Sequence, residues 1–287
     1  MAIIFNEDDI LIPFSFKDIR VKGKILRLNK VCESVVNNFN VSQLIEQIVL
    51  ETIAFNTIIS SNFKFDGVFK LQVNCFDGLI KVLLVDNKSN GDIRAFVTQN
   101  KEFQTTKDQL DFKDLIGKGF LIFHLNQNIQ QQPYQAIVAM DGKDITDVAN
   151  GWFRDSEQIK TYIKFFSDVK SKKCGALFLQ MIPNVYETFE ESAKHKEDFN
   201  TLEILSNTLT QEEMFSDNLY DILYKLYNEF EVITYDKKYY QYNCSCSLEK
   251  VQDMIINFST KDKQDLKNES GEIEVKCEFC NKSYIIR

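Results

Sequence analysis

The pattern of hydrophobic positions changes twice along the chain, and its first part predicts a mixed core. Residues 19–28 alternate between apolar and polar side chains, as a half-buried strand does. Residues 41–60 are apolar around most of a helical circumference, which indicates a largely buried helix. Asn90-Gly91 separates two strand-like runs and is a strong hairpin signal. We therefore predict an amino-terminal mixed α/β core domain over residues 1–183.

The remainder of this first part adds further elements to the predicted core. Residues 119–125 and 134–140 are rich in apolar and aromatic side chains, and we expect each to form a strand. A helix is expected from about Asp144 to Phe166. The apolar run that follows predicts a last buried strand, which stops at Pro183 because proline cannot donate a backbone hydrogen bond.

The pattern becomes helical and acidic in residues 184–240. Glycine and proline are absent there, and Thr210 followed by Glu213 fits a capping box. Beyond this box, apolar side chains at steps of three and four form one stripe, which consists of Leu219, Ile222, Leu223, Leu226, Tyr227 and Phe230. Residues 187–200 have few apolar positions and need docking to stay helical. We predict a helical acidic linker over residues 184–240 and an α+β fold for the whole chain.

The last part, residues 241–287, is predicted to be a small separate unit. Ser247 fits the amino-terminal cap of one helix, and Thr260 fits the start of a second that ends at Gly271. Two short strands then flank the turn from Cys277 to Cys280. A unit of this size buries too little apolar surface to fold alone, and such units depend on a metal or on disulfides.

The charge distribution disfavours several classes of partner. The net charge of −8 resides in residues 184–240, which hold 5 Lys and Arg against 13 Asp and Glu. No segment carries the basic surplus that nucleic-acid binding requires. No apolar run approaches the ~20 residues of a membrane span. Acidic residues follow the first apolar ones at once, which is unlike a secretory signal. We therefore expect a cytoplasmic protein in a reducing compartment, without a nucleic-acid or membrane partner.

The cysteines carry the clearest chemical signal. Four of the seven form two short-spaced pairs, Cys244 with Cys246 and Cys277 with Cys280. Two such pairs from separate segments are the usual source of four thiolates for one tetrahedral zinc ion. A complete thiolate shell leaves no open position for a substrate, which disfavours catalytic zinc. Residues 1–183 offer no catalytic set either, so we expect no enzyme.

This zinc site has two interpretations from the residues alone. The metal is either structural and inert, or part of a switch that oxidation opens. In a switch, neighbours within each pair would join, Cys244 with Cys246 and Cys277 with Cys280, because they are already adjacent. Metal loss would then unfold residues 241–287. The other cysteines lie in helix-like or strand-like sequence and are predicted to be buried apolar residues: Cys32, Cys75 and Cys174.

The order of these features resembles the heat shock protein 33 family of bacterial redox-regulated chaperones. The carboxy-terminal Cys-x-Cys, followed about thirty residues later by GEIEVKCEFCNKSY, carries the resemblance most specifically. Further signatures appear in family order: KFDG, DLIGKGFLIFHL, PYQAIVAMDG with GWFRDSEQIKT, LFLQMIP and ILYKLYNE. The chain departs from the family pattern at Ala95, Ala136, Ala176 and Lys225.

The resemblance implies an ATP-independent holdase that is inactive when reduced and zinc-bound. Oxidation is expected to release zinc, unfold the switch domain and destabilise the linker. Unfolding client proteins would then bind the exposed apolar surface, with the stripe from Leu219 to Phe230 as the candidate, and the active form would be a homodimer. The alternatives are a passive zinc ribbon that binds a protein or nucleic acid, and an enzyme on the core that the tail regulates.

Overall fold

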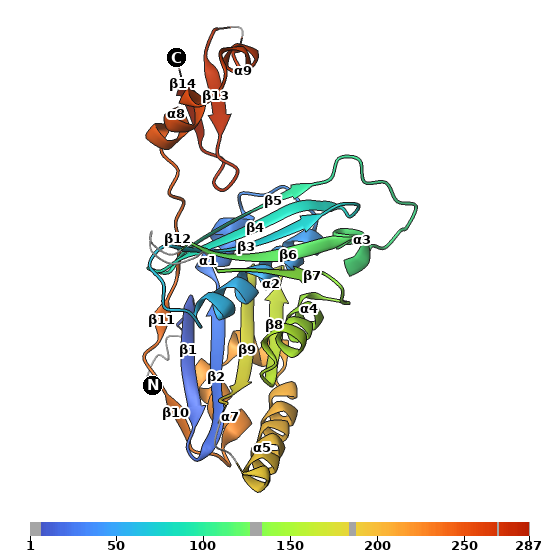
Figure 1. Ribbon diagram of the computed structural model, residues 1–287, viewed down its shortest axis with the longest axis vertical. Helices are drawn as coiled ribbons and strands as arrows, with labels where there is room; N and C mark the ends of the chain where they lie inside the picture. Colours follow the sequence, from blue (N-terminus) through green and yellow to red (C-terminus); the bar gives the residue numbers. More distant parts are fainter. Residues whose placement is uncertain (1–6, 127–133, 184–187, 269, 287) are drawn as a thin grey trace.

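Both ends of the core sequence contribute strands to the first sheet. The computed structural model describes residues 7–126, 134–183, 188–268 and 270–286 (Figure 1). The antiparallel strands at the centre of the first sheet are, in spatial order, β1 (Ile10–Phe16), β2 (Ile19–Leu28), β9 (Lys173–Met181) and β8 (Thr161–Asp168). Strand β9 is buried on both faces, which explains its continuous apolar run.

The second sheet contains the hairpin predicted at Asn90-Gly91. Its main strands are β3 (Val68–Cys75), β4 (Ile80–Lys88), β5 (Asp92–Gln99), β6 (Gly119–Asn126) and β7 (Tyr134–Ala139). They lie in the order β5-β4-β3-β6-β7. The Asn-Gly turn between β4 and β5 is confirmed, and glycine 91 adopts a positive φ of 88° there.

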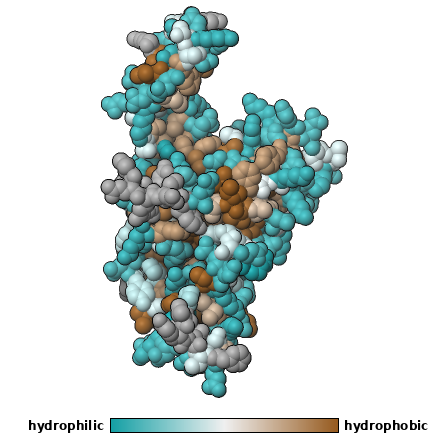
Figure 2. Space-filling model, viewed as in Figure 1, coloured by the Kyte–Doolittle hydropathy of each residue, from teal (hydrophilic) through white to brown (hydrophobic). Residues whose placement is uncertain are grey.

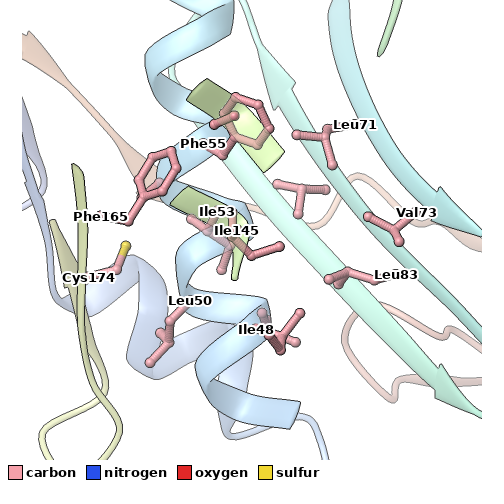
Figure 3. Close-up of a cluster of buried hydrophobic side chains, with 14 of the residues drawn as sticks. Ile48, Leu50, Ile53, Phe55, Leu71, Val73, Leu83, Ile145, Phe165 and Cys174 are labelled. Atoms are coloured by element: carbon pink, nitrogen blue, oxygen red, sulfur yellow. The ribbon is translucent and has the colours of Figure 1, made fainter. Parts of the chain in front are cut away.

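The core lies between the sheets, around the buried helix that the sequence predicts. This helix is α2 (Gln43–Ser60). Figure 3 shows its side chains reaching Leu71 and Leu83 of the second sheet on one side and Phe165 of the first on the other. Three shorter helices, α1 (Lys30–Val36), α3 (Phe112–Ile116) and α4 (Ile145–Trp152), complete this layer. From residue 48 onward α2 is buried on all sides, which explains why this part of the helix has no exposed polar face.

The helix expected from Asp144 to Phe166 is wrong in its second half. Helix α4 continues only as a π-helical turn, η1 (Phe153–Glu157), and Gln158 then takes a left-handed φ of 54°. Strand β8 follows and pairs with β9 along its whole length. Its side chains alternate between the two hydrophobic clusters on either face of the first sheet. Alternation of side chains between two faces is the geometry of a strand and not of a helix.

Three helices cover the outer face of the first sheet, on the side away from α2. They are α5 (Phe189–Asn207), α6 (Gln211–Ser216) and α7 (Leu219–Tyr227). The predicted capping box of Thr210 and Glu213 is confirmed. Helix α6 approaches β9 so closely that a Cβ at position 175 would lie 2.8 Å from the Met214 side chain, so the glycine there permits the contact.

Between the end of α7 and residue 242 the chain is not helical, although a helical linker was predicted as far as residue 240. It forms three short strands, β10 (Val232–Thr234), β11 (Lys238–Tyr239) and β12 (Gln241–Tyr242). Strands β10 and β11 pair with β1 in the first sheet, whereas β12 runs parallel to β5 at the edge of the second. We call residues 232–242 the strap, because this segment crosses from one sheet to the other.

A small carboxy-terminal module, residues 243–286, stands at one end of the long axis, beyond the second sheet (Figure 1). It holds α8 (Leu248–Ile256), α9 (Thr260–Asp265) and the hairpin of β13 (Ile273–Lys276) with β14 (Ser283–Ile286). The cap at Ser247 is confirmed. The second helix begins with a cap at residue 259 and ends at Asp265, six residues before the glycine that was expected to end it.

Candidate metal and redox centre

The structure brings the four predicted cysteines together at the base of the carboxy-terminal module. Cys244 and Cys246 lie in the loop between β12 and α8, and Cys277 and Cys280 lie in the turn between β13 and β14. The Sγ atoms of Cys244 and Cys277 are 3.7 Å apart, and those of Cys246 and Cys280 are 3.4 Å apart. All four sulfurs lie within 4.8 Å of one another. They therefore form one compact cluster.

Local backbone bonds hold both halves of the cluster in place. The amide of Cys277 donates to the carbonyl of Lys282, and the amide of Asn281 donates to the carbonyl of Cys277. Asn281 takes a left-handed φ of 59°, a conformation that asparagine tolerates better than most residues. On the other half, Lys250 Nζ donates to the carbonyl of Ser245 at 2.6 Å. These contacts turn both cysteine pairs toward a common centre.

The sulfur cluster fits a metal ion with tetrahedral thiolate coordination. Four thiolates at a Zn–S distance of ~2.3 Å would be separated by about 3.8 Å from one another. The two contacts of 3.7 and 3.4 Å are close to this value. In the described part of the chain, no other group of three or more metal-ligating side chains comes together. All donors are sulfur, which favours a soft or borderline metal over calcium or magnesium.

The thiols of the cluster differ in pKa. Burial would raise the pKa of Cys246, but hydrogen bonds from the Tyr284 hydroxyl and from the neighbouring thiols lower it to about 7. The Tyr284 hydroxyl lies 3.0 Å from the Cys246 sulfur, and this hydrogen bond raises the pKa of the tyrosine to about 12. Burial raises the pKa of Cys280 to about 12. Cys246 therefore ionises more readily than Cys277 and Cys280, whose pKa values burial raises.

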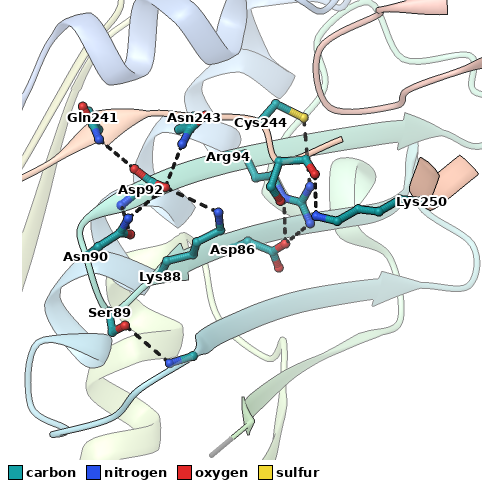
Figure 4. A network of polar contacts seen from close by, with 12 residues as sticks. Asp86, Lys88, Ser89, Asn90, Asp92, Arg94, Gln241, Asn243, Cys244 and Lys250 are labelled. Carbon is teal, nitrogen blue, oxygen red and sulfur yellow. Dashed lines mark hydrogen bonds and ion pairs between the residues drawn. The ribbon is translucent and has the colours of Figure 1, made fainter. Parts of the chain in front are cut away.

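One arginine of the second sheet connects the cluster with the core (Figure 4). Arg94 on β5 donates through Nε and Nη2 to the Asp86 carboxylate, at 2.9 and 2.7 Å. Its Nη1 lies 4.0 Å from the Cys244 sulfur, and its guanidinium carbon lies 3.9 Å from the centroid of the Phe279 ring. One cation therefore contacts a buried carboxylate, a sulfur ligand and an aromatic face.

Two further contacts attach the base of the module to β5. Phe96 meets Phe279 edge to face, with ring centroids 4.9 Å apart. The buried Asp92 carboxylate accepts from Gln241 and from Asn243, each at 2.8 Å (Figure 4). Burial opposes ionisation of Asp92, but these hydrogen bonds lower its pKa. Docking of the module thus rests on a few identifiable side chains.

Comparisons with known proteins agree with this architecture. The family model for the Hsp33 protein matches residues 9–287. The chain belongs to the Hsp33 family. Curated Hsp33 relatives named 33 kDa chaperonin include those of Vibrio parahaemolyticus, 24% identical over 96% of this chain and 92% of the relative, and Proteus mirabilis, 26% identical over 98% and 94%.

A solved Hsp33 structure has the same fold. The crystal structure of the 33 kDa chaperonin from Thermotoga maritima aligns with a TM-score of 0.80 at 20% identity. The alignment covers 98% of this chain and 95% of that one. The predicted family and the α+β fold with a four-cysteine cluster are therefore confirmed.

The stripe of this Hsp33 chain lies far from the cysteines, under the first sheet. Its five helical members, Leu219, Ile222, Leu223, Leu226 and Tyr227, are buried on α7, and Phe230 is half-buried just beyond the helix. The Tyr227 hydroxyl lies 2.6 Å from the Ser206 hydroxyl of α5. The stripe thus packs as one surface against the outer face of the first sheet, at the end of the molecule opposite the cysteine cluster (Figure 1).

Sequence reasoning missed the buried cation that holds the linker helices. The Arg27 side chain on β2 is fully buried and donates through Nη1 to the carbonyls of Met214 and Asp217, at 3.0 and 2.7 Å. Its Nε lies 2.7 Å from the Asp8 carboxylate. The only sequence signal was that Arg27 is out of phase with the polar positions 20, 22 and 24 of the same strand. Arg27 fixes the loop between α6 and α7 to the first sheet.

The remaining candidates have structural roles. Cys32, Cys75 and Cys174 are buried, as predicted, and the sulfurs of Cys32 and Cys174 are 3.3 Å apart. The tryptophan of the GWFRDSEQIKT signature, Trp152, is buried in the core in contact with the ring of Phe123. Among the helices that the structure describes, none is both long and apolar enough to span a membrane.

Proposed function

We propose that this chain is a redox-regulated, ATP-independent chaperone that holds unfolding proteins. Membership of the Hsp33 family supports the chaperone activity. One observation supports redox control: four thiol sulfurs gather within 4.8 Å at the point where the carboxy-terminal module meets the core. Oxidation of these thiols would therefore alter how the whole module is attached to the core. The proposal makes the protein a binding protein and not an enzyme.

The metal in this proposal is one zinc ion, held by Cys244, Cys246, Cys277 and Cys280. When bound, it would keep the four thiolates in one tetrahedron and thereby order the module. The module needs this support, because its buried hydrophobic residues are few: Ile255, Ile273 and Tyr284. We propose that residues 241–287 form the redox-switch domain and residues 184–240 the metastable linker, beyond a core of residues 1–183.

Oxidation of the thiols is the proposed trigger. Each pair of thiolates gives two electrons to one peroxide molecule, takes up two protons, and forms one S–S bond and two waters. We propose the pairs Cys244 with Cys246 and Cys277 with Cys280. A disulfide offers no thiolate, so the oxidised site can no longer hold the metal. The module then loses the interaction that compensates for its small core.

The contacts at β5 provide a route from the cysteines to the linker. When the turn from Cys277 to Cys280 unfolds, Phe279 leaves Arg94 and Phe96. The strap then retains short pairings of two or three residues with β1 and β5 and a few polar contacts, among them those of Gln241 with Asp92 and of Lys237 with Glu7. The linker behind it carries a net charge of −8, and this self-repulsion remains when the strap detaches.

Exposed apolar surface would then bind clients. The candidates are Leu219, Ile222, Leu223, Leu226, Tyr227 and Phe230, together with the face of the first sheet that they cover. Apolar side chains already gather over the middle of the face in Figure 2, whereas the module is mostly hydrophilic there. We further propose a cytoplasmic protein that dimerises when oxidised and binds neither nucleic acid nor membrane.

Aggregation assays distinguish this proposal from a passive zinc ribbon. Reduced, zinc-loaded protein and peroxide-treated protein are added to a heat-denatured test enzyme, while a chelating dye records zinc. The proposal expects protection only after metal release. Retention of zinc under peroxide, with no protection, would support the passive ribbon. Single Cys→Ser changes at the four positions should weaken zinc retention, whereas Cys75→Ser is the control outside the cluster.

A further inference from the structure

A basic hollow lies where the strap crosses the turn between β4 and β5. It has a volume of about 510 Å³ and is lined by the end of α2, this turn and strand β11. Three lysines line it: Lys64 just after α2, Lys88 at the end of β4, and Lys238 in β11. Three serines also line it: Ser60, Ser61 and Ser89. We call this feature the lysine pocket.

The charge of the lysine pocket is the reverse of that of the protein. The chain carries a net charge of −8, yet no carboxylate lines the pocket. Lys88 lies 3.4 Å from the Asp92 carboxylate (Figure 4), whereas among the described residues no ion pair reaches Lys64 or Lys238. Positive charge at this point is therefore poorly compensated.

The excess positive charge at the pocket also affects a neighbouring buried lysine. Lys24 on β2 is buried, and its Nζ donates to Ser61 Oγ and Asn62 Oδ1, each at 2.6 Å. Burial lowers its pKa well below the ordinary value, and the charges of Lys22 and Lys238 lower it further. An anion in the pocket would relieve this repulsion.

We propose that the lysine pocket binds a small phosphate compound with at least two phosphoryl groups. Ammonium groups form charge-assisted hydrogen bonds with phosphate oxygens, and two lysines without an ion pair beside a third that is shared with Asp92 favour a multiply charged anion. The volume exceeds what a bare diphosphate fills. The exposed Tyr239 side chain on the wall offers a surface for an attached ring.

The ligand would bind only the docked form of the chain. Lys238 and Tyr239 belong to the strap, and they reach the pocket because β11 pairs with β1. The strap passes so close to the turn that a Cβ on Gly91 would lie 2.4 Å from the Tyr239 carbonyl oxygen. Because the ligand stabilises the docked strap, at ten times its Kd it would lower the undocked population about elevenfold. This regulatory consequence rests on the proposed function, whereas the binding itself does not.

Calorimetry on the reduced, zinc-loaded full chain tests the binding. Pyrophosphate, ADP and sulfate are titrated separately at low salt. We expect pyrophosphate and ADP to bind, sulfate to bind far more weakly, and added NaCl to weaken all binding. Equal affinity for sulfate would reduce the site to an adventitious ion only. Comparison of pyrophosphate with ADP shows whether an attached ring contributes.

Variants place the binding in the pocket. Lys64→Gln and Lys238→Gln should each weaken pyrophosphate binding about tenfold, and Lys238→Arg should retain it. Lys261→Gln, an exposed lysine on α9, is the matched control. Unchanged affinity in both glutamine variants would overturn the inference. Normal zinc content and circular dichroism would show that these variants fold.

The regulatory consequence has a separate readout. Peroxide-driven thiol loss is followed with and without saturating pyrophosphate, in wild type and in Lys238→Gln. At ten times the wild-type Kd we expect ligand to slow the loss strongly in wild type and at most about twofold in Lys238→Gln. Binding without this protection would refute the coupling and leave the proposed function intact. A chain that binds pyrophosphate but never becomes a holdase would refute the proposed function and leave the site intact.

Discussion

The contact between Phe279 and the second sheet is the point at which docking of the module is most directly testable. Phe279 lies between two of the four cysteines, and its ring meets Phe96 and the Arg94 guanidinium. A double-mutant cycle with Phe96→Ala and Phe279→Ala isolates the aromatic pair. Phe96→Ala lies in the core and leaves the cysteine turn intact. This variant therefore separates loss of docking from damage to the metal site.

The structure sets the expected size of the effect. An edge-to-face aromatic pair contributes about 0.5–1.5 kcal/mol, and a partly exposed cation–π contact contributes about 0.5–1 kcal/mol. Phe279→Ala removes both, so the free energy of docking falls by about 1–2.5 kcal/mol, which raises the undocked population roughly 5- to 70-fold. Phe96→Ala removes only the aromatic pair, for which we expect a roughly 2- to 13-fold rise.

Hydrogen exchange at the strap measures this docking equilibrium. The amides of Gln241 and Asn243 donate to the carbonyls of Gly91 and Ile93, so their protection reports on the undocked population. The cycle should give a coupling free energy of about 0.5–1.5 kcal/mol. Ile285→Ala changes a side chain that is 55% exposed on the same module and serves as the control.

Two outcomes would refute this reasoning. If both alanine variants keep wild-type protection at Gln241 and Asn243, the aromatic contact does not hold the module. If their effects are simply additive, the two rings act through different partners. In either variant, faster zinc release under peroxide is expected to accompany lower protection. Slower release would show that docking promotes oxidation of the thiols instead of limiting it.

Three further predictions concern the linker, the strap and the thiols. Leu223→Ala should cost about 2–5 kcal/mol of α7 packing and give the reduced protein some holdase activity, whereas the neighbouring Tyr224→Ala, 72% exposed, should not. Because the hydrogen bonds lower the pKa of Asp92 in the folded protein, its contribution to docking is present above about pH 4 and lost as the pH falls further, so exchange at the strap should rise there in wild type but not in Asp92→Asn. After peroxide treatment and denaturation, thiol titration should find three free thiols, since burial raises the pKa of Cys75 to about 12 and the other two core cysteines are fully buried.

Local sequence patterns predicted those elements whose burial or backbone conformation is visible in a few consecutive residues. Helix α2 and the turn at Gly91 were recognised because burial on all sides and a left-handed turn leave direct marks in the sequence. Strand β8 was mistaken for the end of a helix. Both of its faces are buried, so its sequence shows no clean alternation of apolar and polar residues, and only its pairing with β9 decides the matter.

The metal site could be predicted from spacing, but its attachment to the core could not. The ligands lie in two short segments, and that closeness is visible in the sequence. Arg94 and Phe279 are separated by most of the chain, and neither stands in a distinctive motif. The same holds for Arg27, whose carbonyl partners lie about 190 residues away. Contacts between such distant residues depend on the order of the strands in the two sheets. That order could not be assigned from the sequence.

The strengths of the attachments imply an order of release. The base of the module is held by Phe279 and a few hydrogen bonds, and strands β11 and β12 pair over only two residues each. The stripe on α7, by contrast, is buried among aromatic and aliphatic side chains, and Arg27 fixes the preceding loop. Oxidation should therefore free the module first, the strap second and the helices last. Hydrogen exchange during oxidation would reveal this order, and simultaneous loss of protection in α7 and the strap would show instead that linker and module open as one cooperative unit.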